Sequence, residues 1–435
     1  MFSPRLTTAL LLSASTLARA IPSLSDVLST TANLSSLNAL LTAQLPDLLK
    51  TLEGYDSNTN PVTLIAPSND AFLRLPDTPL LGPAFSDNDT VQINNFMLYH
   101  VVPGLHPSTS LNKDGSFQFL DTMLTSNNWT NVTGGQRVGA VLQGDAPPIV
   151  VFTSALSTRS VVTNQDIEFT GGILHIVDAF AVPPMPYVYN ADQYNLAYPE
   201  DAVLSFTGAL YSQPSNLSLA TIVNTTSDLT FFVPSNIAME LASEFLAFIP
   251  PTALQELLSY HIVHGAVGPL YSSNFTNGTQ ATTLQGTNLV LYFTGGGYFV
   301  NSARIIASDI LLANGVMHVI DNVLTPDKDA AQPNATTYTQ LPVLPTTMVV
   351  AGDMFNSSAA PFTTFMPDIV STVTSTISDL VSGGSGATAT TTGFGATSTG
   401  KKSGADGLGQ TAHVGVVGSV CVFAFLISVG LFWTS

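Results

Sequence analysis

The chain carries little charge for its length of 435 residues, because only 9% of them are Asp, Glu, Lys or Arg. An average soluble protein has about 25%. Basic residues are the scarcest, with 11 against 29 acidic ones and a formal net charge of −18. Proteins that bind nucleic acids use clustered Lys and Arg to neutralise phosphates. The composition therefore argues against nucleic acid as a partner, and the single basic residue between positions 200 and 327, Arg304, argues against a phosphorylated substrate there.

Cysteine is nearly absent as well, since Cys421 is the only one. One cysteine cannot form an internal disulfide. Apolar residues make up 45% of the chain, which is enough for packed cores. The length suggests two or three domains, and burial of apolar side chains must hold them together.

The first residues have the features of a secretory signal peptide. Arg5 supplies a positive charge, an apolar run follows at 6–17, and Ala18-Arg19-Ala20 fits the cleavage pattern. The apolar run is too short to span about 30 Å of hydrocarbon. We expect residues 1–20 to be removed and the protein to be secreted.

A second apolar stretch, at 414–433, is long enough to span a membrane at about 20 residues. Small residues at 403–405 and a polar spacer at 406–413 precede it. This order is typical of a glycosylphosphatidylinositol (GPI) signal. The sequence predicts attachment of the anchor at Ser403, removal of residues 404–435, and display on the outer leaflet of the plasma membrane or in the cell wall. The alternative is an uncleaved single-pass tail anchor.

Asn-x-Ser/Thr triplets occur ten times, and in a secreted chain they become plausible N-glycosylation sites on surface loops. Two of them fall in an insertion at 127–135, which we expect to be a glycosylated surface loop. The ten asparagines are Asn33, Asn88, Asn128, Asn131, Asn216, Asn224, Asn274, Asn277, Asn334 and Asn356.

Three segments recur in the same order along the chain, which indicates an internal duplication. The matching pairs are 63–72 with 230–239, 98–104 with 259–265, and 172–178 with 315–321. The predicted organisation is a first domain at 22–185, a Pro- and Tyr-containing linker at 186–199, a second domain at 200–327, and a Ser/Thr-rich stalk at 328–403.

Each recurring segment has a structural interpretation. The first predicts a strand that ends at a proline, followed by a helix whose start is capped by Ser68-Asn69 or Ser235-Asn236. The second predicts an amphipathic helix with a histidine, His100 or His261, at the end of its apolar face. The third predicts a strand that is covered on both sides.

Taken together, the three segments resemble the signature segments and the Tyr-His motif of the fasciclin-like domain family. The resemblance covers about residues 22–185 and 200–327. It implies an α+β fold in which each tandem domain is a wedge-like β-sandwich with packed helices. It also implies adhesion or matrix roles at cell surfaces without catalysis, so that no enzyme activity is expected.

Histidine and aspartate recur together, as His175 with Asp178 and His318 with Asp321. Residues three apart on a strand point to opposite faces, so neither pair forms a catalytic dyad unless the strand bulges. No Gly-x-Ser-x-Gly elbow and no cysteine nucleophile of the mature chain support hydrolysis.

A metal site could combine one of these pairs with His100 or His261, but no spacing preassembles it. We therefore expect no metal and no cofactor, and we expect buried histidines with hydrogen-bond partners.

The family resemblance also implies candidate adhesion residues. An Asp-Ile pair before the last segment has been linked to integrin binding in the family, and here Asp166-Ile167 and Asp309-Ile310 are similar to it. The alternative is that the isoleucines are core residues and that the aspartates cap a turn. Tyr99 and Tyr260 carry the same two interpretations, adhesion residue or buried packing residue.

The function expected from the sequence is a non-catalytic cell-surface glycoprotein for adhesion or for organisation of the cell wall or matrix through weak multivalent contacts. Expected partners are matrix, cell-wall or cell-surface glycoproteins or glycans, and the membrane through a lipid anchor. One alternative is a receptor or carrier for a small apolar ligand, with a pocket between the domains. A weaker alternative is a metal-dependent surface enzyme.

Overall fold

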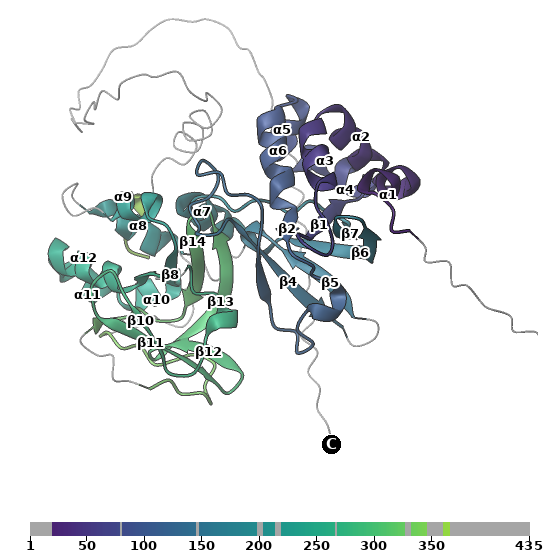
Figure 1. Cartoon of the computed structure of the whole chain (residues 1–435). Helices are drawn as coiled ribbons and strands as arrows, with labels where there is room; N and C mark the ends of the chain where they lie inside the picture. The colour runs from purple at the N-terminus through teal and green to yellow at the C-terminus, as the bar shows by residue number, and fades with distance from the viewer. Residues whose placement is uncertain are drawn as a thin grey trace, which may run out of the picture. The chain divides into compact units, whose positions relative to one another are not determined.

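The computed structural model describes residues 20–78, 81–144, 148–197, 203–213, 219–265, 268–326, 332–345 and 360–365. Two repeats of the same architecture follow one another within one compact unit of the chain (Figure 1). The predicted signal peptide up to Arg19, the C-terminal apolar tail, Ser403, Asn216 and Asn356 lie outside the described residues. Within the described part, no helix has the length and apolar character needed to cross a membrane.

Repeat 1 begins with helices and continues into a sheet. Its helices are α1 (Leu24–Thr30), η1 (Ala32–Leu34), α2 (Ser35–Ala43), α3 (Pro46–Glu53), α4 (Asn69–Leu73), η2 (Leu75–Asp77), α5 (Leu81–Ser86), α6 (Thr90–Tyr99), η3 (Ser108–Ser110) and η4 (Ala155–Ser157). Its strands are β1 (Val62–Pro67), β2 (Val101–Pro103), β3 (Gln118–Asp121), β4 (Arg137–Gln143), β5 (Ile149–Thr153), β6 (Arg159–Phe169) and β7 (Gly172–Val177).

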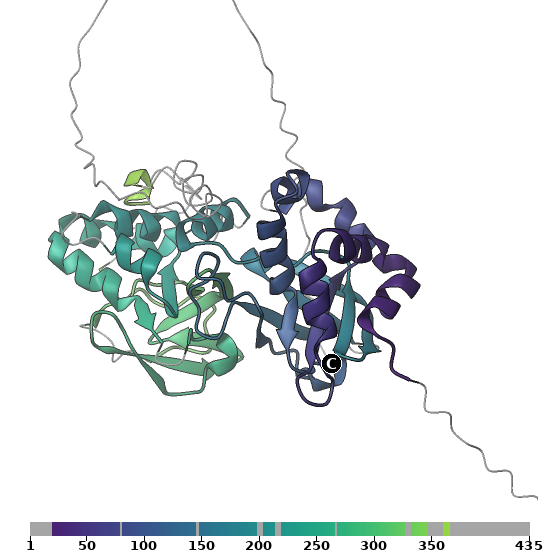
Figure 2. The same ribbon diagram turned by 45° about the horizontal axis from the view of Figure 1, so that its top comes forward.

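Repeat 2 has the same sequence of strands, and its helices lie together on one side of them (Figure 2). The helices are α7 (Tyr187–Ala197), α8 (Leu204–Ser212), α9 (Ala220–Thr225), α10 (Asn236–Leu241), α11 (Ser243–Phe248), α12 (Pro251–Tyr260), η6 (Ser272–Asn274) and η8 (Thr363–Phe365). The strands are β8 (Leu229–Pro234), β9 (Ile262–His264), β10 (Thr279–Thr282), β11 (Asn288–Thr294), β12 (Gly297–Val300), β13 (Ala303–Leu312) and β14 (Gly315–Ile320).

The two sheets have identical topology. Repeat 1 has the order β2-β1-β7-β6-β5-β4-β3, and repeat 2 has the equivalent order β9-β8-β14-β13-β12-β11-β10. One pair in each sheet is parallel, β1 with β7 and β8 with β14, whereas the other neighbours are antiparallel. The duplication and the tandem α+β fold predicted from the sequence are thereby confirmed.

Each sheet curves until its ends approach one another. In repeat 1 the Met123 N–H after β3 donates to the Val101 carbonyl of β2 at 2.8 Å. In repeat 2 the Leu284 N–H after β10 donates to the Ile262 carbonyl of β9 at 2.8 Å. Closing a sheet in this way leaves few unpaired edges.

The local signals in the sequence account for the first strand–helix unit. Every residue of β1 and of β8 is buried, as expected for central strands. The Ser68 hydroxyl then accepts the Ala71 N–H, and the Ser235 hydroxyl accepts the Ala238 N–H, each at 3.3 Å. These are side-chain caps that satisfy otherwise free donors at the starts of α4 and α10.

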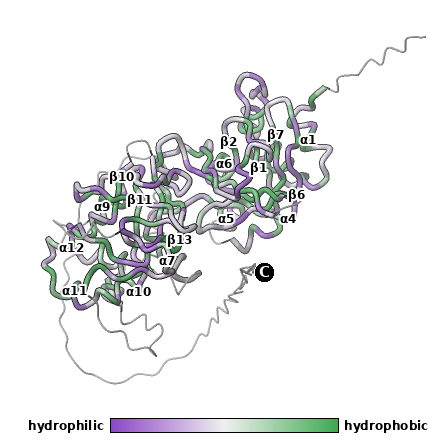
Figure 3. The backbone as a smooth tube through the Cα atoms, turned by 90° about the horizontal axis from the view of Figure 1, so that it is seen from below, coloured by the Kyte–Doolittle hydropathy of each residue, from purple (hydrophilic) through white to green (hydrophobic). Residues whose placement is uncertain are grey.

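Each repeat has two apolar clusters, one between the helices and the sheet and one inside the curved sheet. Hydrophobic and hydrophilic stretches alternate along the chain of both repeats (Figure 3). This is the pattern of elements with one buried side, and burial of that side supplies the main driving force for folding.

The stretch predicted to be a linker is instead the first helix of repeat 2. Tyr187 in α7 is fully buried, and its ring stacks on Phe231 at 4.6 Å between centroids. The Tyr187 and Thr207 hydroxyls lie 3.1 Å apart in a hydrogen bond. Tyr187, the first tyrosine of this stretch, is thus a core residue.

Repeat 2 also extends beyond residue 327, where the sequence analysis placed the start of the stalk. The Gln340 N–H donates to the Asp321 carboxylate at 2.9 Å, and Leu344 is buried in the main core of repeat 2. Further on, the Ser205 hydroxyl in α8 donates to the Pro361 carbonyl, and Phe362 packs on the same core. The described segments at 332–345 and 360–365 therefore pack on repeat 2.

The insertion at 127–135, predicted to be a surface loop, exposes Asn128 and Asn131 and also contacts repeat 2. The Asn131 N–H donates to the Ala313 carbonyl at 2.7 Å. The Asp228 carboxylate accepts the Thr133 N–H at 2.9 Å and the Thr133 hydroxyl at 2.6 Å. Just beyond the insertion, Gln136 is fully buried and donates to the Leu312 carbonyl at 3.0 Å.

Candidate functional site

The two repeats hold four buried histidines at equivalent positions. His100 and His261 follow the last residues of α6 and α12, and His175 and His318 lie in the central strands β7 and β14. They are the side chains in which the sequence analysis sought catalytic or metal-binding chemistry, so their partners decide what they can do.

His100 and His261 each connect a helix end to a distant backbone segment. Their Nδ1 atoms donate to the carbonyls of Phe96 and Leu257, at 2.7 and 2.8 Å. Their Nε2 atoms accept the N–H groups of Ala181 and Leu324, both at 2.9 Å. Accepting at Nε2 requires the neutral ring. Burial lowers the pKa of both imidazoles to about 4.

His175 and His318 are also neutral, because one nitrogen of each ring accepts a hydrogen bond. Their proton lies on Nε2 and not on Nδ1. Their Nδ1 atoms accept the backbone N–H of Asp166 at 3.3 Å and of Asp309 at 3.2 Å. Their Nε2 atoms donate to the carbonyls of His106 and Leu270, at 3.0 and 2.9 Å. Burial lowers the pKa of both rings.

These bonds use both nitrogens of every ring and leave no lone pair for a metal ion. Among the residues that the structure describes, no group of three or more His, Cys, Asp or Glu side chains could hold one.

The aspartates nearest to the strand histidines are Asp166 and Asp309, not the Asp178 and Asp321 that the sequence analysis paired with them. Asp178 and Asp321 accept the Val161 and Arg304 N–H groups, at 2.7 and 2.8 Å. Burial raises the pKa of Asp321. The carboxylate Oδ1 of Asp166 lies 4.0 Å from His175 Nε2.

Irregularities in β6 and β13 create this arrangement. The pairing register shifts at these points, and Asp166 and Asp309 have φ angles of 58° and 62°. The Asp166 carboxylate accepts the Ser108 N–H at 2.8 Å and the Ser108 hydroxyl. Asp309 accepts the same two groups of Ser272, with the N–H at 2.7 Å.

The residues that follow these aspartates belong to the apolar cores. Ile310 is buried, and Ile167 is half-buried against the core of repeat 1. A strand bulge cannot be read from a pattern of alternating residues. The repeated Asp-Ile pair was the only sequence signal of this arrangement.

Tyr99 and Tyr260 are fully buried at the ends of their helices. The Tyr99 hydroxyl donates to the Arg137 carbonyl at 2.8 Å, and the Tyr260 hydroxyl donates to the Asn288 carbonyl at 3.3 Å. Asn301 donates to the Tyr260 oxygen at 3.0 Å. Each hydroxyl thereby attaches a helix end to the sheet.

The predicted glycosylation sites that the structure describes are exposed, in contrast to the buried histidines and tyrosines. All eight of these asparagines within the described residues are exposed: Asn33, Asn88, Asn128, Asn131, Asn224, Asn274, Asn277 and Asn334. One of them also bonds between the repeats, since the Asn131 side chain donates to the Thr225 carbonyl at 2.8 Å.

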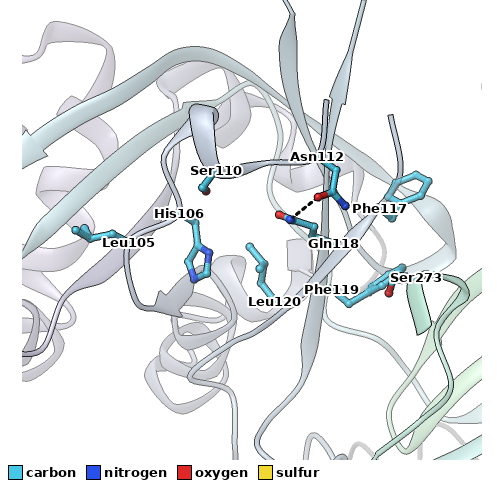
Figure 4. Close-up of a pocket in the computed structure, with 9 residues that line it drawn as sticks. All are labelled: Leu105, His106, Ser110, Asn112, Phe117, Gln118, Phe119, Leu120 and Ser273. Carbon is cyan, nitrogen blue, oxygen red and sulfur yellow. Dashed lines mark hydrogen bonds between the residues drawn. The ribbon is translucent and has the colours of Figure 1, made fainter. Parts of the chain in front are cut away.

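An open hollow of about 410 Å³ lies beside η3 and β3 (Figure 4). The side chains around it include Leu105, His106, Asn112, Phe117 and Gln118, together with Ser273 of repeat 2. A carrier of a small apolar molecule needs an enclosed, mainly apolar cavity. This hollow is open and half polar, and the sequence analysis singled out none of its residues, because they belong to no motif.

The Fasciclin domain family model matches residues 32–183 and 206–326 of the chain. A fasciclin-like arabinogalactan protein of Arthroderma benhamiae is 30% identical over 272 residues, which cover 62% of this chain and 60% of that protein. Fasciclin-like arabinogalactan protein elcF of Phaeosphaeria nodorum is 29% identical over 307 residues, with 70% and 89% covered.

Among solved structures, a FAS1 domain pair from the insect cell adhesion molecule Fasciclin I covers 68% of this chain and 98% of its own, with 15% identity and a TM-score of 0.32. The two regions matched by the family model coincide with the two repeats and make up more than half of the chain. The protein therefore belongs to the fasciclin domain family, with two tandem copies of that domain.

Proposed function

We propose that this protein is a secreted, N-glycosylated cell-surface protein that acts without catalysis in cell adhesion or in organisation of the cell wall or matrix. One observation carries the proposal. The side chains best suited to catalysis or metal binding, the four histidines and their aspartates, make hydrogen bonds inside the fold. The described glycosylation sites, in contrast, are all exposed.

The names of related proteins support the same role. The relatives from Arthroderma benhamiae and Phaeosphaeria nodorum are called fasciclin-like arabinogalactan proteins. We extend this extracellular, adhesive role to the present chain, with matrix, cell-wall or cell-surface glycoproteins or glycans as its partners.

The proposed GPI anchor would determine how the protein acts in adhesion. A GPI group at Ser403 would hold many copies on one surface, at the end of a Ser/Thr-rich stalk. Tethering raises the effective concentration of each binding site, so weak individual contacts suffice for stable adhesion.

The test compares cells that produce the protein with cells from which its gene is deleted. We expect the deletion to reduce cell-to-surface adhesion or resistance to wall-perturbing agents, and we expect the full-length protein to restore it. The matched control is a form that ends at residue 403, which is secreted but not displayed and should not restore the phenotype. Unchanged behaviour of the deletion strain in both assays would contradict the proposed role.

A further inference from the structure

The open hollow beside η3 and β3, called the rim hollow below, has the composition of a binding site for an uncharged molecule. None of its lining side chains is Asp, Glu, Lys or Arg. A charged ligand would lose water there without gaining an opposite charge, which is unfavourable. The His106 ring also has its Nε2 in a hydrogen bond with the Pro103 carbonyl at 2.9 Å.

The polar lining offers both donors and acceptors in a fixed arrangement. The Gln118 amide donates to Asn112 Oδ1 at 2.9 Å, and the Asn112 amide donates to the Ser116 hydroxyl at 2.8 Å (Figure 4). These bonds hold the two amides in place and leave Gln118 Oε1 as an acceptor and a second N–H on each amide as a donor. Ligand hydroxyls, which both donate and accept, match such a set.

Two aromatic rings supply the apolar part of the hollow. The centroids of Phe117 and Phe119 are 6.1 Å apart with 28° between the ring planes, and Phe119 stacks on Tyr271 at 4.5 Å. The three rings form a row in which Tyr271 is the buried end and Phe117 is the half-exposed end. The negative face of an aromatic ring attracts C–H groups, which cover the faces of sugar rings.

Repeat 2 shows that the fold does not require these aromatic side chains. Its equivalent strand, β10, is also four residues long and also pairs antiparallel with the next strand. Where β3 has Phe119 at its second position, β10 has Gln280. Phe119 lies between Tyr271 and Phe117, and Phe117 is the half-exposed end of this row of rings.

We propose that the rim hollow binds an uncharged oligosaccharide that belongs to another molecule, such as a glycan of a neighbouring surface. This inference rests on the adhesive role proposed above and names the class of ligand for it. The open shape leaves much of a bound sugar in water, so each contact is weak, and many tethered copies would be needed for adhesion.

Binding can be measured with the full-length secreted protein and neutral hexasaccharides as probes, namely laminarihexaose, mannohexaose and chitohexaose. We expect at least one of them to bind with a dissociation constant between about 0.1 and 10 mM, as found for weak sites. Phe117→Ala and Gln118→Ala should each weaken this binding at least tenfold. Phe293→Ala, which removes a more exposed ring from β11 of repeat 2, is the control and should leave this binding unchanged.

Three results would overturn the proposal. The first is that no neutral probe binds, and the second is that binding is equal in Phe117→Ala and in the unchanged protein. The third is that binding appears only in Asn274→Gln, because Asn274 follows the lining residue Ser273 and its own glycan would then be the occupant. If cells that display Phe117→Ala still adhere fully while sugar binding is lost, the hollow binds sugar but is not the adhesive contact, and the adhesive role stands on other surfaces.

Discussion

At the scale of single residues, the repeated histidines act as neutral connectors. His100 and His261 each join a helix end to a backbone N–H that is far away in the sequence. A proton on Nε2 would break that bond and place a charge in an apolar core, which explains the lowered pKa. The sequence identified these residues and their burial, but hydrogen-bond partners 81 and 63 positions away could not be inferred from it.

Stability should therefore fall as the pH is lowered. Above pH 6.5 both histidines are neutral in the folded and unfolded chain. Between pH 6.5 and 4 the two histidines take up protons in the unfolded chain. In the folded protein they stay neutral over this range, because their pKa is about 4. The free energy of unfolding should drop by about 2 kcal/mol per histidine between pH 7 and pH 5. Urea unfolding at several pH values measures it. His261→Gln should show a shallower pH dependence, and an unchanged slope in that variant would contradict the mechanism.

At the scale of elements, the structure reassigns three segments that composition alone described poorly. The insertion at 127–135 is a docking loop, the predicted linker is helix α7, and part of the predicted stalk packs on repeat 2. In each case a polar or Pro-rich stretch contains a few side chains that are buried by residues distant in sequence. Such partners are absent from any local pattern, so local signals cannot reveal them.

The docking loop should be released by changing Asp228, because its carboxylate accepts hydrogen bonds from both the N–H and the hydroxyl of Thr133. Asp228 has a φ of 56°, a conformation that alanine adopts poorly. Asp228→Ala should therefore speed hydrogen exchange at the Asn131 amide at least tenfold, because its N–H is protected at this contact by the bond to the Ala313 carbonyl. Thr133→Ser keeps the hydroxyl and the glycosylation triplet and serves as the control. Equal exchange in Asp228→Ala and the unchanged protein would show that the loop docks without this pair.

The segment at 360–365 should be displaced by adding one methyl group to α8. A Cβ at Gly208 would collide with the carbonyl oxygen of Phe362, so this glycine allows the close approach of the two backbones. Gly208→Ala should increase proteolytic cleavage near Phe362 several-fold, because the displaced segment becomes accessible. Ser212→Ala, at the last residue of the same helix, should not increase this cleavage. Resistance of Gly208→Ala to cleavage would mean that the segment is held by other contacts.

At the scale of the whole molecule, the two repeats share one topology but differ at the surfaces that bear on function. Repeat 1 alone carries the docking loop and the aromatic side of the rim hollow, while repeat 2 provides Asp228 and Ser273. A duplicated core with unequal surfaces suits a protein that presents one composite face to its surroundings. The proposed tether decides where that face is presented.

The tether can be tested on intact cells. We expect a phosphatidylinositol-specific phospholipase to release the protein from the cell surface into the medium, because the predicted anchor is a lipid linked at Ser403. The measurement is the fraction of protein found in the supernatant. A matched form with an unrelated membrane-spanning helix in place of residues 404–435 should remain on the cells. Retention of the natural protein after treatment would favour the uncleaved tail anchor instead.

The sequence by itself determined the duplication and the positions of the strand, cap and helix units, because these depend on local periodicity and on turn chemistry, and the α+β class followed from the family resemblance. Only the tertiary structure decided which groups meet: Asp166 with His175 and Ser108, Thr133 with Asp228, and Phe119 with Tyr271. These contacts depend on strand bulges and on packing between segments far apart in the chain. The energy that fixes them comes from burial in the complete fold, which no short stretch of sequence contains.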